Sequence, residues 1–415
     1  MTDKIKEIDA RAMDACSESF RSIDSISHYC TEKVLNAFSE QRISEAHLHG
    51  STGYGYTDIG RDALDKVYAC AFECEDALVR PQIISGTHAL TIALFGMLRP
   101  GDYMLSITGS PYDTLYDVVG INEGTGSLKE YGIGYIEIPF ENSEFDIEKI
   151  KEHLKNKSIK LIFIQKSKGY LNRRTLSSKE IGDITKVIKD IRPDIYVMTD
   201  NCYGEFCEKH EPVYYGVDLM VGSLIKNAGG GLAKTGGYLA GTHECIERCS
   251  YRLTCPGIGR ESAATGEYLK DFYQGFFMAP HTVAQALKTA VYCANVFKSI
   301  GYAVNPEPDS KRYDIIQTIA LGSPDALIAF CQGIQQGAPI DSFAAPVPGD
   351  MAGYADKVIM AAGTFVQGAS IELSADGPLR APYTAFMQGA LTFESGRLGI
   401  LKALENIFKI NGKSL

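Results

Sequence analysis

The sequence predicts an α/β protein with a large, doubly wound, mostly parallel sheet domain and a smaller α+β domain at its C-terminal end. Between residues 78 and 240, short apolar runs of strand type alternate with amphipathic runs of helix type. This alternation is typical of a parallel sheet with helices on both faces. After about residue 290 the alternation stops, and 415 residues are enough for a second core.

The N-terminal segment, residues 1–45, is predicted to be helical because apolar residues such as Val34 and Phe38 recur at helical spacing. The stretch HLHGSTGYGYTDIGRD, residues 47–62, is rich in glycine and tyrosine and is predicted to be a loop. A helix follows at 63–72. The predicted domains are therefore an N-terminal helical segment at 1–45, a large domain at 46–290 and a small domain at 291–415.

The apolar runs predict the strands and helices of the large domain. Its predicted strands are Leu78–Val79 with Gln82–Ser85, Tyr103–Ile107, Tyr135–Ile138, Leu161–Gln165, Tyr196–Thr199, Leu219–Ser223 and Gly237–Ala240. Its predicted helices are His88–Leu98, Thr114–Gly120, Ile147–Leu154 and Ser178–Ile191. In the small domain we expect strands at Tyr313–Leu321, Val358–Met360 and Ser370–Leu373, a helix at Pro324–Gln335, a surface loop at Gly337–Asp356 and a largely helical end at Tyr383–Phe408.

Composition excludes several classes of function. A net charge of -10 argues against nucleic acid or an anionic membrane as a partner. We find no apolar run of 18 residues and no signal-peptide pattern, so a cytoplasmic location is expected. Eleven cysteines suit reduced thiols in that compartment. Cys245, Cys249 and Cys255 match no common zinc spacing, and no metal site is expected.

Ligands of such sheets bind beyond the carboxyl ends of the strands, where three unusual segments occur. In SGTHAL, residues 85–90, Gly86 and Thr87 open a helix whose free N–H groups suit a phosphate, although simple helix capping also explains the segment. In VMTDNCYGEF, residues 197–206, Asp200 ends a strand. Its carboxylate could pair with a protonated ring nitrogen, bind a metal or cap a helix.

In GSLIKNAGGG, residues 222–231, Ser223 and Lys226 follow another strand. Burial lowers the pKa of a lysine, and a neutral amine forms a Schiff base with an aldehyde. A phosphate cradle, an acid, a second hydroxyl and an amine are the groups that pyridoxal 5'-phosphate (PLP) requires. Tyr112, in GSPYDT after the 103–107 strand, is placed to stack on the PLP ring.

These motifs, with FIQKSKGY and ELSADGPLRAPY, resemble the fold type I PLP-dependent enzymes over nearly the whole chain. More closely, the chain resembles the cystathionine/methionine gamma-lyase-like family named for aluminium resistance. The resemblance implies that Arg380 binds the substrate carboxylate. It also implies a homodimer or homotetramer with shared active sites, in which a tyrosine–arginine pair reaches the phosphate of a neighbouring subunit. That pair has no clean match in this chain, and Tyr54, Tyr56 and Arg61 are the candidates for it. The implied cofactor-binding residues are Gly86, Thr87, Tyr112, Asp200, Ser223, Lys226, Tyr56 and Arg61, and the implied catalytic residues are Lys226, Tyr112 and Asp200.

The chain departs from that family at Ile225, where well-studied members carry a second hydroxyl residue before the lysine. The expected function is a carbon–sulfur lyase acting on cystathionine, cysteine or methionine by β- or γ-elimination. A PLP-dependent aminotransferase and a non-catalytic PLP-fold binding protein stay open as alternatives. GGGLAKTGG, residues 229–237, superficially resembles a P-loop, but a P-loop that ends at Lys234–Thr235 requires glycine at positions 228 and 233, which hold Ala228 and Ala233.

Overall fold

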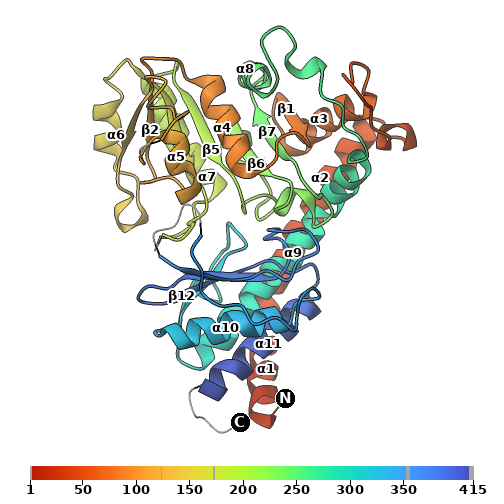
Figure 1. Ribbon diagram of the computed structural model, residues 1–415, viewed down its shortest axis with the longest axis vertical. Helices are drawn as coiled ribbons and strands as arrows, with labels where there is room; N and C mark the ends of the chain where they lie inside the picture. The colour runs from red at the N-terminus through yellow and green to blue at the C-terminus, as the bar shows by residue number, and fades with distance from the viewer. Residues whose placement is uncertain (1, 123, 172, 352–355, 411–415) are drawn as a thin grey trace.

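The protein is described here by a computed structural model that covers residues 2–122, 124–171, 173–351 and 356–410. Within these residues the chain forms two domains, the larger above the smaller in Figure 1. The large domain holds a seven-stranded sheet of order β1-β7-β6-β5-β4-β2-β3. The small domain holds a five-stranded sheet of order β10-β11-β12-β9-β8. The predicted α/β architecture with a second, smaller domain is confirmed.

In the large sheet, only β7 runs antiparallel to its neighbours, β1 and β6, while the other neighbouring pairs are parallel. The mostly parallel sheet predicted from the sequence is therefore confirmed. The strands are β1 (Asp76–Arg80), β2 (Tyr103–Ser106), β3 (Gly134–Glu137), β4 (Ile159–Gln165), β5 (Tyr196–Asp200), β6 (Leu219–Ser223) and β7 (Gly237–Gly241). The helices around them are α3 (Ile59–Phe72), α4 (Gly86–Met97), α5 (Tyr116–Val119), α6 (Ile147–His153), α7 (Ser178–Ile191) and α8 (His243–Leu253).

The sheet is buried on both faces because its strands are apolar at successive positions. Successive side chains of a strand point to opposite faces. Leu161 and Phe163 of β4 pack into the core shared with α4 and α8. Ile162 and Ile164 pack into the core shared with α6 and α7. This is the physical reason why β4 reads as a continuous apolar run.

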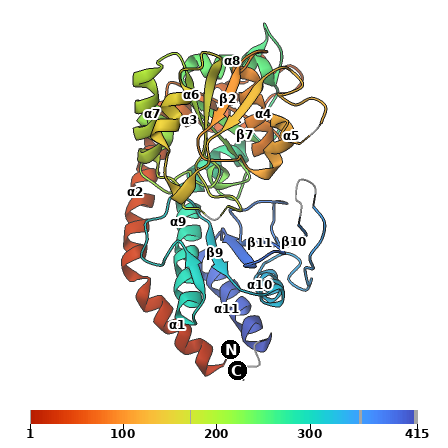
Figure 2. The ribbon, with the colours of Figure 1, turned by 90° about the vertical axis from the view of Figure 1, so that its left-hand side faces the viewer.

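Long helices connect the two domains. Helices α1 (Asp3–Ala15) and α2 (Ser17–Glu40) run along one side of the molecule beside α9 (Leu269–Ser299), as Figure 2 shows. The apolar core around α9 includes residues of both domains. The boundary expected at residue 290 thus falls inside α9, which belongs to both cores.

In the small domain, α10 (Pro324–Gln336) packs against an antiparallel sheet, and α11 (Phe393–Ile410) packs against α10 and α9. Its strands are β8 (Ala303–Asn305), β9 (Gln317–Ala320), β10 (Val358–Ala361), β11 (Ser374–Pro378) and β12 (Thr384–Gln388). The strand predicted at Ser370–Leu373 is wrong, since β11 begins at Ser374. The region predicted to be helical from Tyr383 contains β12, because that segment pairs with both β9 and β11.

Two smaller details also differ from the sequence prediction. Residues 82–85, expected to continue the first strand, form the turn into α4. In the predicted loop Gly337–Asp356, residues 352–355 lie outside the described residues, and Gly349 makes an isolated bridge to Val358. No helix in the part of the chain that the structure describes combines the length and apolar character needed to cross a membrane.

Candidate active site at the carboxyl ends of the large sheet

Strands β5 and β6 bring three of the predicted residues together. Asp200 is the last residue of β5 and Ser223 the last of β6, and these two strands are parallel neighbours. Lys226 follows three residues after Ser223. The carboxyl ends of parallel strands meet at one edge of a sheet, which is where open α/β sheets bind ligands. The strand order therefore explains why residues 26 positions apart share one site.

Lys226 lies among acidic groups. Its Nζ is 4.2 Å from the centre of the Tyr203 ring. Burial by itself lowers the pKa of this amine, but Cys202, Tyr203 and Asp200 raise it, and the net pKa lies above its ordinary value. The sequence argument, which expected burial to dominate and leave a neutral amine, is therefore wrong for the protein alone. The titratable groups around Lys226 outweigh desolvation.

The pKa of Asp200 is shifted by burial and by its neighbours as well. Burial raises the pKa of its carboxyl group, while the charge of Lys226 and the N–H of Cys202 oppose that rise. The Cys202 N–H donates to Asp200 Oδ1 at 3.0 Å. The carboxylate is thus fixed in direction and lies within electrostatic range of the lysine, as a partner for a protonated ring nitrogen requires.

The helix α4 begins next to Ser223. Ser85 caps the helix, since its hydroxyl accepts a bond from the His88 N–H at 3.0 Å. The N–H groups of Gly86 and Thr87 precede the first internal carbonyl partner and so are available to an anion. A Cβ placed on Gly86 would lie 3.5 Å from Ser223 Cβ, so the helix start and the serine are neighbours.

The Ser223 hydroxyl provides the test of whether these residues fit a phosphate. The residue is 1% exposed, and its Oγ has no hydrogen-bond partner among the described protein atoms. A buried hydroxyl without a partner costs free energy, so native proteins almost always satisfy it. A phosphate oxygen at the start of α4 would satisfy it. The residues present therefore fit PLP.

Tyr112 lies close to this cradle and beside a second segment. Two residues after it, the Thr114 hydroxyl is 2.8 Å from that of Thr87 at the start of α4. The Tyr112 ring is 6.1 Å from that of Tyr170, centre to centre. It also leaves little room at Gly169, where an added Cβ would lie 3.0 Å from the ring. The tyrosine predicted to stack on the cofactor is thus held at the edge of the site.

A cavity of about 480 Å³ lies between the domains, and Arg380 is part of its wall. This volume is in the range of small-molecule sites. The Arg380 side chain is 55% exposed and pairs with Asp356 at 3.1 Å. Burial raises the pKa of Asp113, and the charge of Arg380 opposes that rise, so Arg380 lies within electrostatic range of the residue after Tyr112.

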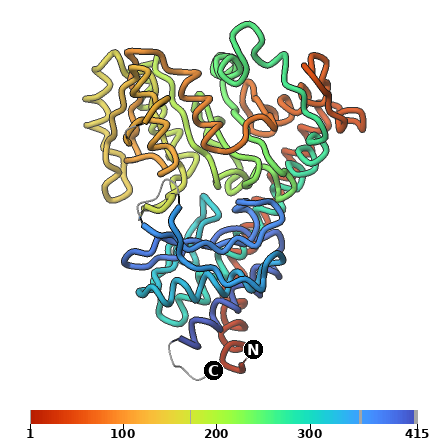
Figure 3. Tube along the Cα trace, in the orientation of Figure 1, coloured from red at the N-terminus to blue at the C-terminus, as the bar shows by residue number. Residues whose placement is uncertain are grey.

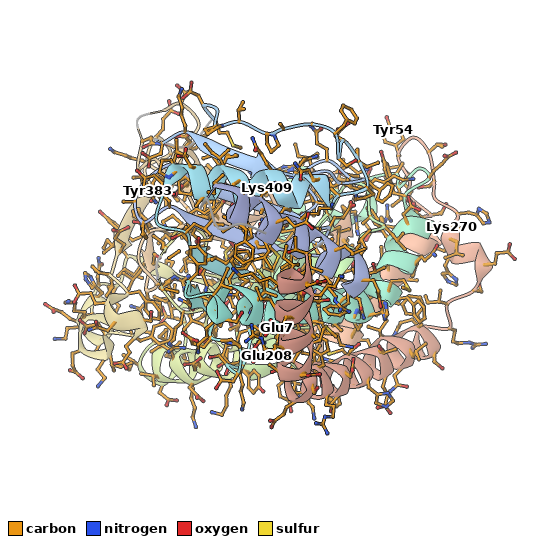
Figure 4. All side chains as sticks on the ribbon, turned by 90° about the horizontal axis from the view of Figure 1, so that it is seen from below. Glu7, Tyr54, Glu208, Lys270, Tyr383 and Lys409 are labelled. Atoms are coloured by element: carbon orange, nitrogen blue, oxygen red, sulfur yellow. The ribbon has the colours of Figure 1, made fainter. Side chains whose placement is uncertain are left out.

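The structure does not bring Tyr56 and Arg61 to this site. Tyr56 is 59% exposed and stacks on Tyr54, with ring centres 5.3 Å apart. Their loop lies at the outer edge of the large domain in Figure 3. In Figure 4, Tyr54 and Tyr383 lie on opposite sides of the view, and Tyr383 follows the turn that carries Arg380.

Arg61 has a role within its own chain that the sequence did not reveal. Its side chain is 1% exposed, and it donates to the Gly55 carbonyl at 2.7 Å and to the Ala263 carbonyl at 3.4 Å. Its Nε pairs with Asp62 at 2.8 Å. The expectation that Arg61 reaches a neighbouring phosphate is at odds with this burial, because the guanidinium is used to hold its own loop.

Three buried residues near the site were not singled out from the sequence. Glu205 is fully buried, and burial raises the pKa of its carboxyl group to about 8. Lys166 and Lys168 follow β4 and are also buried. The motif FIQKSKGY was recognised as a whole, and two lysines directly after a predicted strand were the signal that could have identified them.

Comparison with known proteins agrees with this geometry. The family model described as methionine gamma-lyase matches residues 5–408. The uncharacterized protein YnbB of Bacillus subtilis (strain 168) is 50% identical over 392 residues, 94% of this chain and 93% of that protein. A solved structure named carbon-sulfur lyase involved in aluminum resistance, from Clostridium novyi NT, has a TM-score of 0.95 at 52% identity and covers 98% of this chain and 96% of that one.

A Listeria monocytogenes structure, whose name gives cystathionine beta-lyase involved in aluminum resistance as a provisional assignment, has a TM-score of 0.95 at 47% identity. It covers 97% of this chain and 100% of that one. The PLP-dependent protein YhfS from Escherichia coli is 15% identical and shares the fold, with a TM-score of 0.61. The resemblance read from the motifs is confirmed, and the chain belongs to the methionine gamma-lyase family.

Proposed function

We propose that this chain is a PLP-dependent lyase that breaks a carbon–sulfur bond in a sulfur amino acid such as cystathionine, cysteine or methionine. The observation that carries the proposal is the meeting of the unpartnered Ser223 hydroxyl, the Asp200 carboxylate and the Lys226 amine at the ends of β5 and β6. Membership of the methionine gamma-lyase family and the name of the Clostridium novyi relative support the reaction class.

Each group has a distinct binding role in this proposal. The Ser223 hydroxyl and the N–H groups of Gly86 and Thr87 would hold the phosphate of PLP. Asp200 would keep the pyridine nitrogen protonated. Lys226 would carry the cofactor covalently, and Tyr112 would stack on its ring.

The proposed chemistry then depends on proton movements between protein groups and substrate. Bound PLP supplies an electron sink at the α carbon. When the substrate's amino group takes the place of Lys226 on the cofactor, the Lys226 amine would be set free, and a ring N–H that engages Asp200 would weaken one of the contacts that favour its ammonium form. The free amine could then take the α proton. Tyr112 gives a proton to the leaving sulfur as the carbon–sulfur bond breaks. With one water consumed, the products are a thiol, ammonia and a 2-oxoacid.

Product analysis tests this proposal. The PLP-loaded protein should release thiol and 2-oxoacid in equal amounts from at least one of cystathionine, cysteine and methionine, and Lys226→Ala should release neither. Borohydride should fix the cofactor to the peptide that contains Lys226. Oxoacid without thiol, formed only when an acceptor oxoacid is present, would identify an aminotransferase instead. No product from any amino acid would identify a non-catalytic binding protein.

We further propose that the protein works in the cytoplasm as a homodimer or homotetramer with shared active sites. Each of the eleven cysteines is free, as expected in a reducing compartment. The exposed Tyr54–Tyr56 stack lies on the opposite side of the view in Figure 4 from Tyr383, which follows the Arg380 turn, and an exposed aromatic pair of this kind suits contact with another subunit. A closed two-fold dimer would form two equivalent sites of this kind.

A further inference from the structure

The cavity between the domains presents two positive side chains on a largely apolar wall. The large domain contributes Lys168 and Tyr170, and the small domain contributes Arg380 and Phe386. Tyr170 connects this cavity to the cofactor site, because its ring lies 6.1 Å from that of Tyr112 and 4.9 Å from that of Phe386. A substrate bound beside Tyr112 would therefore extend its side chain along this wall.

Lys168 is a buried charge with weak partners. The residue is 1% exposed. Among the described residues, its Nζ donates to Asn305 alone, to the backbone carbonyl at 3.3 Å and to Oδ1 at 3.4 Å. Charge-assisted hydrogen bonds are normally about 2.7–2.9 Å long. In the described part of the chain, no carboxylate oxygen pairs with this ammonium, which has three N–H groups to satisfy.

Lys166, two residues earlier and equally buried, has the close partners that are expected of a structural lysine. Its Nζ pairs with Glu208 at 2.9 Å and donates to the Ser178 hydroxyl at 2.8 Å. The Glu208 charge raises the pKa of Lys166 against the effect of burial. Lys168 has no such carboxylate in contact, and an uncompensated buried charge is costly. An anion that enters the cavity would remove this cost.

The charges packed around Lys168 favour an anion as well. Burial lowers the pKa of its ammonium to about 8; Asp314 opposes the fall, while Arg312 and Arg173 add to it. The Asp314 carboxylate is occupied elsewhere, since it accepts from the Thr175 hydroxyl and from a backbone N–H. Lys168, Arg312 and Arg173 all lie within electrostatic range of the occupied Asp314 carboxylate, and of these three cations Lys168 is the one that lines the cavity.

We propose that Lys168 binds a second acidic group at the far end of the substrate's side chain. This inference rests on the function proposed above and narrows its substrate class to thioether amino acids that end in a carboxylate. Arg380 would bind the α-carboxylate, and Lys168 the distal one. Lys168 is then a specificity-determining residue rather than a structural one.

The test compares S-(2-carboxyethyl)-L-cysteine with S-butyl-L-cysteine, which has a similar length but no distal charge. At pH 7 the wild-type protein should prefer the acid in kcat/KM. Lys168→Met should reduce that preference about 10- to 100-fold, mainly through KM, as expected for loss of one charge-assisted hydrogen bond. Lys168→Arg should keep part of the preference. Lys179→Met, which changes an exposed lysine, should leave it intact.

The pH dependence separates this role from a structural one. Between pH 7 and pH 9 the wild-type preference should fall as the ammonium loses its proton near pH 8. Lys168→Arg should not show this fall, because a guanidinium stays charged. A structural lysine would change both substrates equally, and an equal loss in Lys168→Met with no change in preference would overturn the proposal.

Binding without turnover separates this inference from the proposed function. Cofactor-loaded Lys226→Ala protein should bind the acid more tightly than the butyl compound in calorimetry, and Lys168→Met added to it should remove the difference. If that result is obtained but neither compound yields thiol with the wild-type protein, the lyase proposal fails and Lys168 keeps its role. If both compounds yield thiol but bind equally, Lys168 loses its role and the lyase proposal stands.

Discussion

Replacing Ser223 by alanine should weaken PLP binding without harming the cofactor-free protein. The hydroxyl is buried and has no partner among the described protein atoms. A hydrogen bond to a charged group contributes about 1.5–3 kcal/mol, so we expect PLP to bind about 10- to 100-fold more weakly. An unsatisfied buried hydroxyl costs about 1–3 kcal/mol, so the cofactor-free variant should melt at the same temperature as the wild type or higher.

Two measurements check this prediction: a PLP titration followed by absorbance, and thermal unfolding with and without PLP. The stabilisation by saturating PLP should shrink by about 1.5–3 kcal/mol in Ser223→Ala, because it depends on the logarithm of the affinity. Ser178→Ala is the matched control. Its hydroxyl accepts from Lys166 and donates to Glu208, each at 2.8 Å, so this variant should lose stability and keep its PLP affinity.

The opposite pattern would refute the reasoning. If Ser223→Ala binds PLP as tightly as the wild type, the hydroxyl does not contact the phosphate. If the cofactor-free variant melts at a lower temperature, the hydroxyl has a protein or water partner that already satisfies it. The first result would remove Ser223 from the proposed cradle and leave only the start of α4 as its anchor, and the second would show that the empty site does not leave this hydroxyl unsatisfied.

Three further variants test other parts of the molecule. Burial raises the pKa of Glu205 from 4.5 to about 8. Between these two pH values the folded state keeps a proton that the unfolded state has released, so the free energy of unfolding should fall as pH rises from 4.5 to 8. Glu205→Gln should remove that slope in thermal unfolding and stabilise the protein most at pH 8; an unchanged slope would contradict the buried acid. Arg380→Lys should raise KM about 10-fold or more and leave the spectrum of the bound cofactor unchanged, since it alters only a bidentate carboxylate contact; unchanged kinetics would exclude Arg380 from the site. Inactive Lys226→Ala chains mixed with Tyr56→Ala chains of reduced activity should recover part of the wild-type activity after subunit exchange, and no recovery despite proven exchange would exclude a shared site that uses Tyr56.

The central residues of the candidate site could be predicted because each one follows a strand. Asp200, Ser223 and the nearby Lys226 were found by looking just past apolar runs. In a parallel sheet this local rule has a long-range consequence, since the ends of neighbouring strands meet. A residue's place relative to a strand is local information, and it is present in the sequence.

The segments that were assigned wrongly depend on pairing rather than on local pattern. Residues 384–388 were expected to be helical, yet they form β12 because β9 and β11 flank them. The periodicity of so short a segment does not separate a strand from a helix. Pairing with β9 and β11 determines that this segment is a strand.

By itself, the sequence determined the fold class, the family motifs and the order of a phosphate cradle, an acid and a lysine along the chain. Only the tertiary structure decided which charged groups are free to bind a ligand. Arg61 is occupied by the carbonyls of Gly55 and Ala263, the latter 202 residues away. Lys166 pairs with Glu208, while Lys168, in the same motif, donates to the oxygens of Asn305. The type of a side chain is written in the sequence, but its hydrogen-bond partners come from segments that only folding brings into contact.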